Sequence, residues 1–294
     1  MQLSANGIAI EVEDHGPTNG EPLLLIMGLG MQLIAWPDEL VQRLVALGFR
    51  VIRFDNRDVG LSQGFDELGV PNLAWAGLKY TMRLPVAAPY GLHDMAGDAV
   101  GVLDALGIAR AHVCGVSMGG MIAQQLAARH PQRVKSQTLV MTTSGARHLP
   151  QARPHVRRAL ISRPPRGAGR DGVVSHLEAF LMLIGSPGFP SPPAQLRHRV
   201  ETAVHRAWRP AGSARQLLAV AADGDRSPLL SRMRIPTHVM HGREDPLVPC
   251  AAAHDLQSKI EGATLDLIDG MGHDLPVQLM PRLAQGIADN AARA

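Results

Sequence analysis

The chain has 294 residues, of which 46% are hydrophobic and 19% are charged, and it carries a net charge of +3. These values exclude a disordered polymer and favour one packed core with an inserted segment. The two cysteines, Cys114 and Cys250, lie far apart and match neither a disulfide framework nor a zinc-binding pattern, so we expect no metal site and a cytoplasmic protein.

The N-terminal residues predict a hairpin, because the turn Asn6-Gly7 precedes alternating apolar residues. No cationic start precedes an apolar run here. The longest apolar stretch, residues 23–36, is interrupted by Gly and Gln. We therefore expect neither an export signal nor a membrane-spanning segment.

A regular alternation of strands and helices follows the hairpin. The apolar run 23–27, bounded by Pro22 and Gly28, is typical of a strand that is buried on both faces. Pro37 can start a helix that Gly48 ends. The next expected elements are strand, helix, strand, helix and strand at residues 51–54, 93–107, 111–115, 118–130 and 134–141. This order predicts an α/β fold with a mostly parallel sheet and helices on both faces.

The alternation stops near residue 143 and resumes near residue 232. Pro- and Gly-rich strings such as RPPRGAGR and SPGFPSPP interrupt this stretch, with helical fragments expected at 176–184 and 195–208. We expect residues 144–231 to form a helical cap inserted into a core domain of residues 1–143 and 232–294. Strands at 235–241 and 264–268 and helices at 251–260 and after Pro276 complete this core.

The predicted cap is electrostatically distinct from the core. Residues 147–234 hold 15 basic and 5 acidic side chains, a balance that could attract nucleic acid or an anionic substrate. Most of the basic residues are arginines scattered among Pro and Ala without interleaved aromatic residues, so solvated surface is the simpler interpretation. We expect no nucleic-acid partner and no membrane partner.

The string Gly115-Val116-Ser117-Met118-Gly119 lies between an expected strand and an expected helix. A G-x-S-x-G string in this setting is typical of a nucleophile elbow, a tight turn that presents the serine hydroxyl to a site. The N-terminus of the helix favours the negative charge that develops during acyl transfer. In the alternative interpretation, the string is an ordinary loop in which Ser117 caps the helix.

A serine nucleophile needs a base, and the base needs an acid that orients it. After an elbow of this kind the acid precedes the histidine, and both follow later strands. Asp245 and His273 occupy the loops after the last two expected strands, so we predict them as acid and base. Glu244 and Asp269 compete with Asp245, which we favour because Pro246 bends the chain directly after it.

Acyl transfer also needs two backbone N–H groups that bind the developing oxyanion. We expect one from Met118 and the other from the loop that follows the strand at 23–27. Leu29 is the residue we favour in that loop, and Gly30 is the alternative.

Two long strings resemble the α/β-hydrolase superfamily. MGLGMQLIAWPDELVQRLVALGFRVIRFDNRDVGLS and HVCGVSMGGMIAQ are similar to its aclacinomycin methylesterase-like esterase branch, including Met27-Gly28 where other members carry His-Gly. The resemblance implies the α/β-hydrolase fold and the same site residues that position predicts. It also implies that Asp55, Arg57 and Asp58 organise a loop and take no part in catalysis.

We therefore expect a carboxylic-ester hydrolase that forms an acyl-enzyme with a small-molecule ester and needs no cofactor. Aliphatic residues of the predicted cap, such as Leu181 and Leu217, favour short or medium acyl chains. Lactone opening, cofactor-free perhydrolysis of the haloperoxidase type and carbon–carbon bond hydrolysis use the same triad and stay open. A non-catalytic, ligand-binding member of the fold also stays open. Both a monomer and a homodimer are compatible with the sequence.

Overall fold

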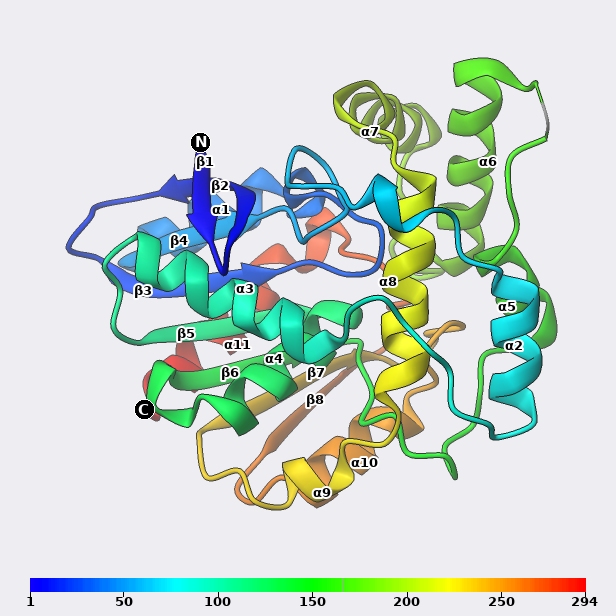
Figure 1. Ribbon diagram of the computed structural model, residues 1–294. Helices are drawn as coiled ribbons and strands as arrows, with labels where there is room; N and C mark the ends of the chain where they lie inside the picture. The colour runs from blue at the N-terminus through cyan, green and yellow to red at the C-terminus, as the bar shows by residue number, and fades with distance from the viewer. Residues whose placement is uncertain (166) are drawn as a thin grey trace.

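A computed structural model describes residues 1–165 and 167–294, and an eight-stranded sheet forms its centre (Figure 1). Arg166, which falls inside the predicted cap, lies outside the described residues. The strands follow the order β1-β2-β4-β3-β5-β6-β7-β8 across the sheet. Their bounds are β1 Gln2–Ala5, β2 Ile8–His15, β3 Glu21–Ile26, β4 Phe49–Phe54, β5 Ala111–Val116, β6 Val134–Val140, β7 Thr237–Gly242 and β8 Thr264–Ile268.

The direction of the strands matches the predicted α/β fold. β1 pairs antiparallel with β2, and β2 pairs antiparallel with β4, whereas all pairs from β4 through β8 are parallel. The predicted N-terminal hairpin is confirmed, because Asn6 and Gly7 both have positive φ and connect Ala5 to its register partner Ile8. The carboxyl ends of the parallel strands meet at one edge of the sheet, where loops can share a site.

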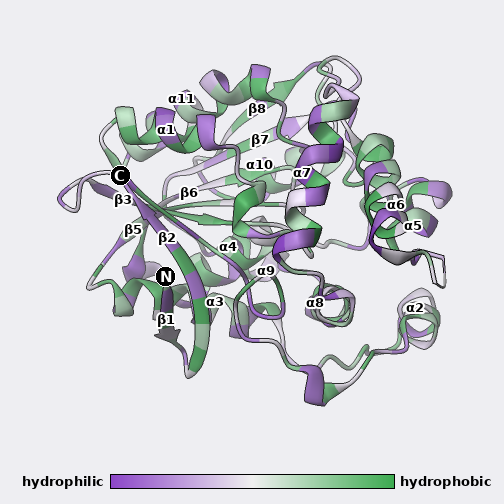
Figure 2. Cartoon of the chain, turned by 90° about the horizontal axis from the view of Figure 1, so that it is seen from above, coloured by the Kyte–Doolittle hydropathy of each residue, from purple (hydrophilic) through white to green (hydrophobic). Residues whose placement is uncertain are grey.

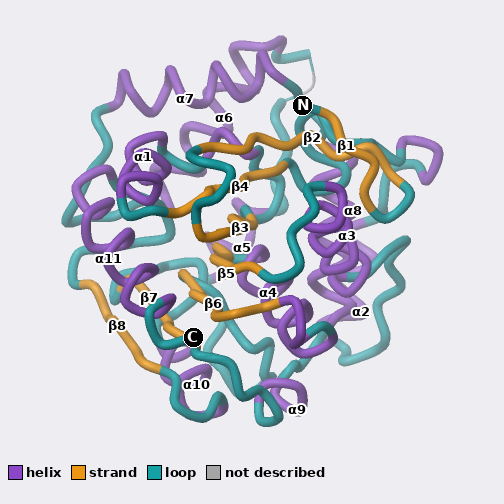
Figure 3. The backbone as a smooth tube through the Cα atoms, turned by 90° about the vertical axis from the view of Figure 1, so that its left-hand side faces the viewer, coloured by secondary structure: helices purple, strands orange, loops and turns teal. Residues whose placement is uncertain are grey.

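Helices cover both faces of the sheet (Figures 2 and 3). α1 and α11 pack on one face, and α3, α4 and α10 pack on the other. The helix bounds are α1 Asp38–Ala46, α2 Leu73–Thr81, α3 Leu92–Ala105, α4 Met118–Arg129, α5 Pro154–Leu160, α6 Gly169–Ile184, α7 Pro193–Arg206, α8 Pro210–Asp223, α9 Ser227–Leu230, α10 Ala251–Lys259 and α11 Met280–Ala291. Short 3-10 helices lie at Leu33–Ala35, Asp66–Leu68, Pro131–Arg133 and Val277–Leu279.

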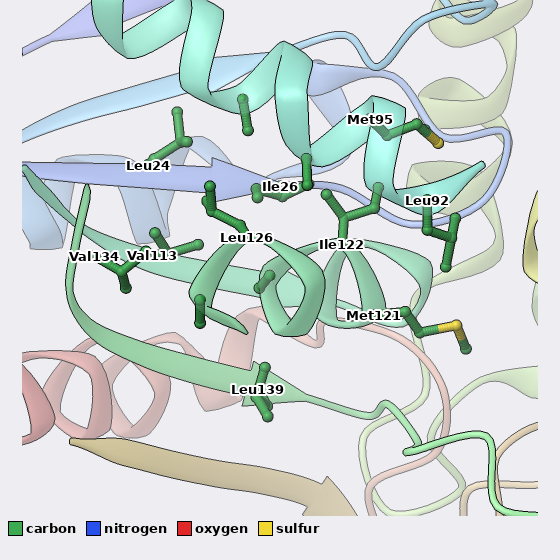
Figure 4. Packing of buried hydrophobic residues seen from close by; sticks show 14 of the residues in the cluster. Leu24, Ile26, Leu92, Met95, Val113, Met121, Ile122, Leu126, Val134 and Leu139 are labelled. Atoms are coloured by element: carbon green, nitrogen blue, oxygen red, sulfur yellow. The ribbon is translucent and has the colours of Figure 1, made fainter. Parts of the chain in front are cut away.

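The continuous apolar run of β3 is explained by its place between two cores. Leu24 and Ile26 face the core beneath α3 and α4, where Ile122 of α4 packs (Figure 4). Leu23 and Leu25 point to the opposite face, toward α1 and α11. Each such fully buried side chain stabilises the fold by about 1.5–3 kcal/mol. β3, which leads into the loop of Leu29, is therefore rigidly held.

Residues 144–231, called the cap segment below, join β6 to β7 and carry α5 to α9. α8 contacts α3 and also α2, a helix that the sequence did not predict and that precedes the cap segment. α9 contacts α4 and α10, and its Leu230 is fully buried in the core beneath them. The chain therefore passes gradually from cap to core, and the exact boundary at residue 231 stays a prediction. Within residues 1–165 and 167–294, no helix combines the length and apolarity needed to cross a bilayer.

Candidate active site

Ser117 occupies a strained turn between β5 and α4. Its backbone has φ 54° and ψ −118°, a conformation that L-residues rarely adopt. A Cβ on Gly115 would collide with the Gly119 carbonyl, and a Cβ on Gly119 would collide with the Ile26 carbonyl, so only glycine fits on either side of the turn. Among the described residues, the Ser117 side chain accepts no hydrogen bond from the first turn of α4. The alternative interpretation, in which Ser117 caps this helix, is therefore wrong.

His273 and Asp245 lie in line with the Ser117 hydroxyl. The Ser117 hydroxyl donates to His273 Nε2 over an Oγ–Nε2 distance of 3.0 Å, and His273 Nδ1–H donates to Asp245 Oδ2 over 2.7 Å. Asp245 and His273 are buried, while Ser117 is partly exposed to the cavity described below. The structure thus brings together three side chains that follow β5, β7 and β8, with Ser117 and His273 156 residues apart in the sequence. This order of groups lets the imidazole accept the hydroxyl proton.

The Asp245 carboxylate is anchored on both oxygens. Oδ1 accepts the N–H groups of Leu247 at 2.9 Å and Val248 at 2.8 Å. The fully buried His241 lies beside it, with Nε2 3.4 Å from Oδ2 and 2.8 Å from the Val248 carbonyl. Burial alone would raise the pKa of Asp245, but His273 and His241 outweigh it and hold the pKa well below its usual range. Asp245 is therefore ionised, and its carboxylate accepts hydrogen bonds without donating one.

The competing acids point elsewhere. Glu244 accepts the Gly270 N–H at 2.7 Å, and Asp269 forms an exposed ion pair with Arg243. Glu244 nevertheless supports the site, because its bond holds the loop that carries His273. The structure therefore favours Asp245 over both alternatives.

The loop of His273 is fastened to the end of α6 in the cap segment. The His273 N–H donates to the Ile184 carbonyl at 2.7 Å, and the Gly272 N–H donates to the Ser186 hydroxyl oxygen at 2.8 Å. The Ser186 hydroxyl itself donates to Asp274, whose pKa is raised because burial outweighs this bond. The end of α6 thus positions the histidine, a role that the sequence did not reveal.

The loop after β3 offers a backbone donor beside Ser117. The Gly30 N–H already donates to Oε1 of the fully buried Gln216 at 2.8 Å, so Gly30 is occupied. Asn56 Nδ2–H donates to the Met27 carbonyl at 2.9 Å and holds the start of the loop. In the part of the chain that the structure describes, the Leu29 and Met118 N–H groups have no protein acceptor. This arrangement supports Leu29 over Gly30 as the second donor.

Gln216 and Asn56 are site residues that sequence reasoning missed. Asn56 belongs to the FDNRD string, whose polar residues offered a signal, whereas Gln216 lies on α8, where no strong motif marks it.

The FDNRD string organises its loop through buried ion pairs. Asp55 accepts from Arg206 of α7, and Arg57 donates to Asp98 of α3 through two bonds of 2.6 Å. Asp58 accepts two bonds from Arg215 of α8, at 2.7 and 2.8 Å, and one from Tyr90 at 2.7 Å. The predicted loop-organising role of Asp55, Arg57 and Asp58 agrees with these contacts.

One large cavity of about 1650 Å³ opens onto Ser117 and His273. Its walls come from the loop after β3, from α2 and from the cap segment, and they are mostly apolar. Apolar lining residues include Met27, Leu29, Met121, Leu177, Phe180 and Leu217. This volume exceeds the roughly 300–1,000 Å³ of common small-molecule pockets.

The α/β hydrolase fold family model matches residues 21–278. The chain belongs to this family. Rhodomycin D methylesterase DauP of Streptomyces sp. strain C5 is 28% identical over 313 residues, which cover 99% of this chain and 98% of the relative. A 2-hydroxymuconate semialdehyde hydrolase of Pseudomonas sp. strain CF600 is 27% identical over an alignment that covers 100% of this chain and 94% of the relative.

Solved structures share the whole fold. The meta-cleavage product hydrolase CumD of Pseudomonas fluorescens IP01 matches with a TM-score of 0.77 at 19% identity, over 100% of this chain and 97% of its own. The enol-lactonase of Burkholderia xenovorans LB400 matches with a TM-score of 0.73 at 22% identity, over 99% and 100% of the two chains. The comparisons confirm the predicted fold and the resemblance to methylesterases, and they identify a hydrolase of the α/β fold.

Proposed function

We propose that this chain is a carboxylic-ester hydrolase with Ser117 as nucleophile, His273 as base and Asp245 as the acid that orients it. The observation that carries the proposal is the hydrogen-bonded series from Ser117 Oγ through His273 to Asp245 at a strained elbow. The methylesterases among its relatives support an ester as the substrate.

The chemistry follows from this geometry in two halves. Ser117 Oγ attacks the ester carbonyl carbon while His273 Nε2 accepts the hydroxyl proton, and the carbonyl oxygen takes up the negative charge near the Leu29 and Met118 N–H groups. His273 then gives its proton to the departing alkoxide, which leaves an acyl-enzyme on Ser117. Water attacks that ester by the same route and releases the acid.

The size of the substrate is the finer question. The sequence favours short or medium acyl chains, which the apolar walls suit, but a cavity of about 1650 Å³ also has room for a much larger acid. The relatives that are methylesterases point to methyl esters. We therefore extend the proposal to methyl esters of bulky acids, in which the small alcohol leaves and the acid fills the cavity.

Replacing Ser117 by Ala tests the proposal. We expect kcat for p-nitrophenyl and methyl esters to fall by roughly 10⁴-fold or more, because no other group can form the acyl-enzyme. Labelling by a fluorophosphonate should disappear together with activity, while the circular dichroism spectrum stays unchanged. Ser175→Ala, an exposed position on α6, is the matched control. Full activity in Ser117→Ala would exclude this mechanism.

Carbon–carbon bond hydrolysis is the second candidate, because a 2-hydroxymuconate semialdehyde hydrolase matches over the full chain. Lactone opening and perhydrolysis use the same side chains. A substrate panel of esters, lactones and a vinylogous diketone, measured with and without hydrogen peroxide, separates these reactions. A preference of the wild-type enzyme for the diketone would favour the second candidate.

A further inference from the structure

Five arginines of the cap segment line the catalytic cavity without an ion-pair partner; two of them, Arg199 and Arg209, lie on and after α7, and the other three lie together on and after α5. Arg157 and Arg158 belong to α5, and Arg163 lies in the loop that follows. Within residues 1–165 and 167–294, no carboxylate oxygen lies within 4.0 Å of their guanidinium nitrogens. By contrast, Arg206 and Arg215 of the same segment are each paired with a buried aspartate. The three arginines, called the arginine rim below, therefore carry uncompensated charge.

The surroundings do not neutralise the arginine rim. The sequence has no Asp or Glu from residue 105 to residue 170. The carboxyl groups that line the cavity are engaged elsewhere: Asp38 pairs with Arg53 at 2.9 Å, Glu244 accepts the Gly270 N–H, and Asp274 accepts the Ser186 hydroxyl. The excess of positive charge therefore acts on whatever enters the cavity.

The arginine rim and the nucleophile lie on different parts of the cavity wall. Ser117 is flanked by the apolar loop after β3, whereas α5 lies with α2 at the end of the molecule far from β1 (Figures 1 and 2). Apolar residues such as Leu177 and Phe180 also line the cavity. The cavity thus combines apolar walls with a cationic region at α5 and the loop that follows it.

We propose that the substrate is an amphiphilic ester that carries an anionic group, a carboxylate, phosphate or sulfate, away from the ester bond, and that the arginine rim binds this group. The inference rests on the proposed esterase function and adds the chemical class of its substrate. Guanidinium groups bind carboxylate and phosphate oxygens through paired hydrogen bonds, and low-dielectric walls concentrate their field inside a cavity. The arginines are exposed, so water weakens each contact and the three act together.

Matched pairs of esters test this inference. p-Nitrophenyl octanoate and the mono-p-nitrophenyl ester of suberic acid have the same chain length and differ only in a distal carboxylate. Shorter and longer pairs, from succinate to dodecanedioate, cover a range of distances between the ester bond at Ser117 and the arginine rim. We expect the wild-type enzyme to prefer the anionic member at one length or more. This preference, the ratio of the two kcat/KM values, should fall roughly tenfold in Arg157→Gln/Arg158→Gln/Arg163→Gln and should decline with added salt.

Arg153→Gln is the control, because Arg153 precedes α5 and does not line the cavity; its ratio should equal that of the wild type. Equal kcat/KM values for both members at every length, or a ratio unchanged in the triple variant, would overturn the inference and leave the esterase proposal standing. Binding of RNA or anionic vesicles that the triple variant loses, without any preference among esters, would also overturn it.

A calorimetric titration separates the two proposals further. Ser117→Ala protein should bind the mono-p-nitrophenyl suberate more tightly than the octanoate, whether or not the wild type turns either ester over. Hydrolysis of neither ester, together with this difference in binding, would contradict the esterase proposal alone. Equal binding would contradict the arginine rim.

Discussion

Asp245 is a buried carboxylate whose charge is held by its neighbours. Two backbone N–H groups and the imidazoles of His273 and His241 surround it, and together they hold its pKa well below the usual range although burial acts in the opposite direction. Such a group keeps His273 in the tautomer that presents Nε2 to Ser117. Its charge also contributes to stability, since the folded chain binds the proton less tightly than the unfolded chain does.

Replacing Asp245 by Asn should lower activity and change the acid stability of the protein. An amide can offer His273 the wrong tautomer, so we expect kcat to fall about 10³–10⁴-fold. As pH drops below about 4, the unfolded chain takes up a proton before the native Asp245 does. The stability that this carboxylate adds is therefore fully present above about pH 5 and is lost as pH falls toward its native pKa.

Thermal unfolding between pH 6 and pH 3 measures this difference. The stability advantage of the wild type over Asp245→Asn should shrink by more than about 1 kcal/mol across this range. Asp269→Asn removes an exposed carboxyl group of a neighbouring loop and serves as the control. A constant difference between wild type and Asp245→Asn at all pH values would contradict the assigned direction.

Single residues of the site differ in how well the sequence marks them. Ser117 lies in a motif whose flanking strand and helix are both recognisable, and His273 directly follows the last strand. Asp245 and Glu244 are neighbours of the same charge, and only the folded turn decides which carboxylate faces the histidine. Leu29 and Gly30 are likewise adjacent, and what distinguishes them is the side chain of Gln216, 186 residues away, which accepts the Gly30 N–H.

At the scale of elements, the strands and the core helices are predictable because their apolar residues recur with clear periods. α2, α5, α8 and α9 were not predicted. α8 does carry ordinary signals, since Pro210 starts it and Gly224 ends it with φ 69°. Those signals lie in a Pro- and Gly-rich stretch, where many other Pro and Gly residues could equally well start or end a helix. α2 has apolar residues on all sides and buries none of them, so no amphipathic period marks it.

α8 places Gln216 against the loop that carries Leu29. Its Oε1 accepts the Gly30 N–H and its Nε2 donates to the Arg57 carbonyl, both at 2.8 Å. Gln216→Leu removes both bonds, and we expect kcat for esters to fall roughly 10- to 100-fold with a smaller change in KM, because a displaced donor affects the transition state more than the bound ester.

A matched set of variants checks this role of Gln216. Gln216→Glu keeps an acceptor for the Gly30 N–H and should recover part of kcat. Gln195→Leu, at an exposed position of α7, should behave as the wild type. A boronic acid that mimics the tetrahedral intermediate should lose more affinity for Gln216→Leu than a simple product acid does. Equal losses for both ligands would show that Gln216 only supports the fold.

At the scale of the whole molecule, one short loop connects core and cap. Asp55, Arg57 and Asp58 pair respectively with α7, α3 and α8, so residues 55–58 join elements that are far apart in the sequence. Buried ion pairs add little net stability by themselves, but they allow few alternative arrangements of the helices they connect. This long-range pairing could not be predicted from the sequence, because many arginines of the cap segment are equally plausible partners for the two aspartates.

Breaking one of these pairs tests whether the loop holds the cap segment in place. Asp58 and Arg215 are both almost fully buried, and the pair lowers the pKa of Asp58 although burial alone would raise it. Arg215→Met leaves that carboxylate buried without its cation, so we expect the free energy of unfolding to fall by about 3–5 kcal/mol. Asp58→Asn/Arg215→Met removes both charges and should regain a large part of this loss.

Denaturant unfolding of the wild type, the two single variants and the double variant gives the coupling energy of the pair. Arg232→Met, at an exposed position beyond α9, is the control. If the losses of the two single variants simply added in the double variant, the pair would not be coupled, and α8 would be held by its other contacts.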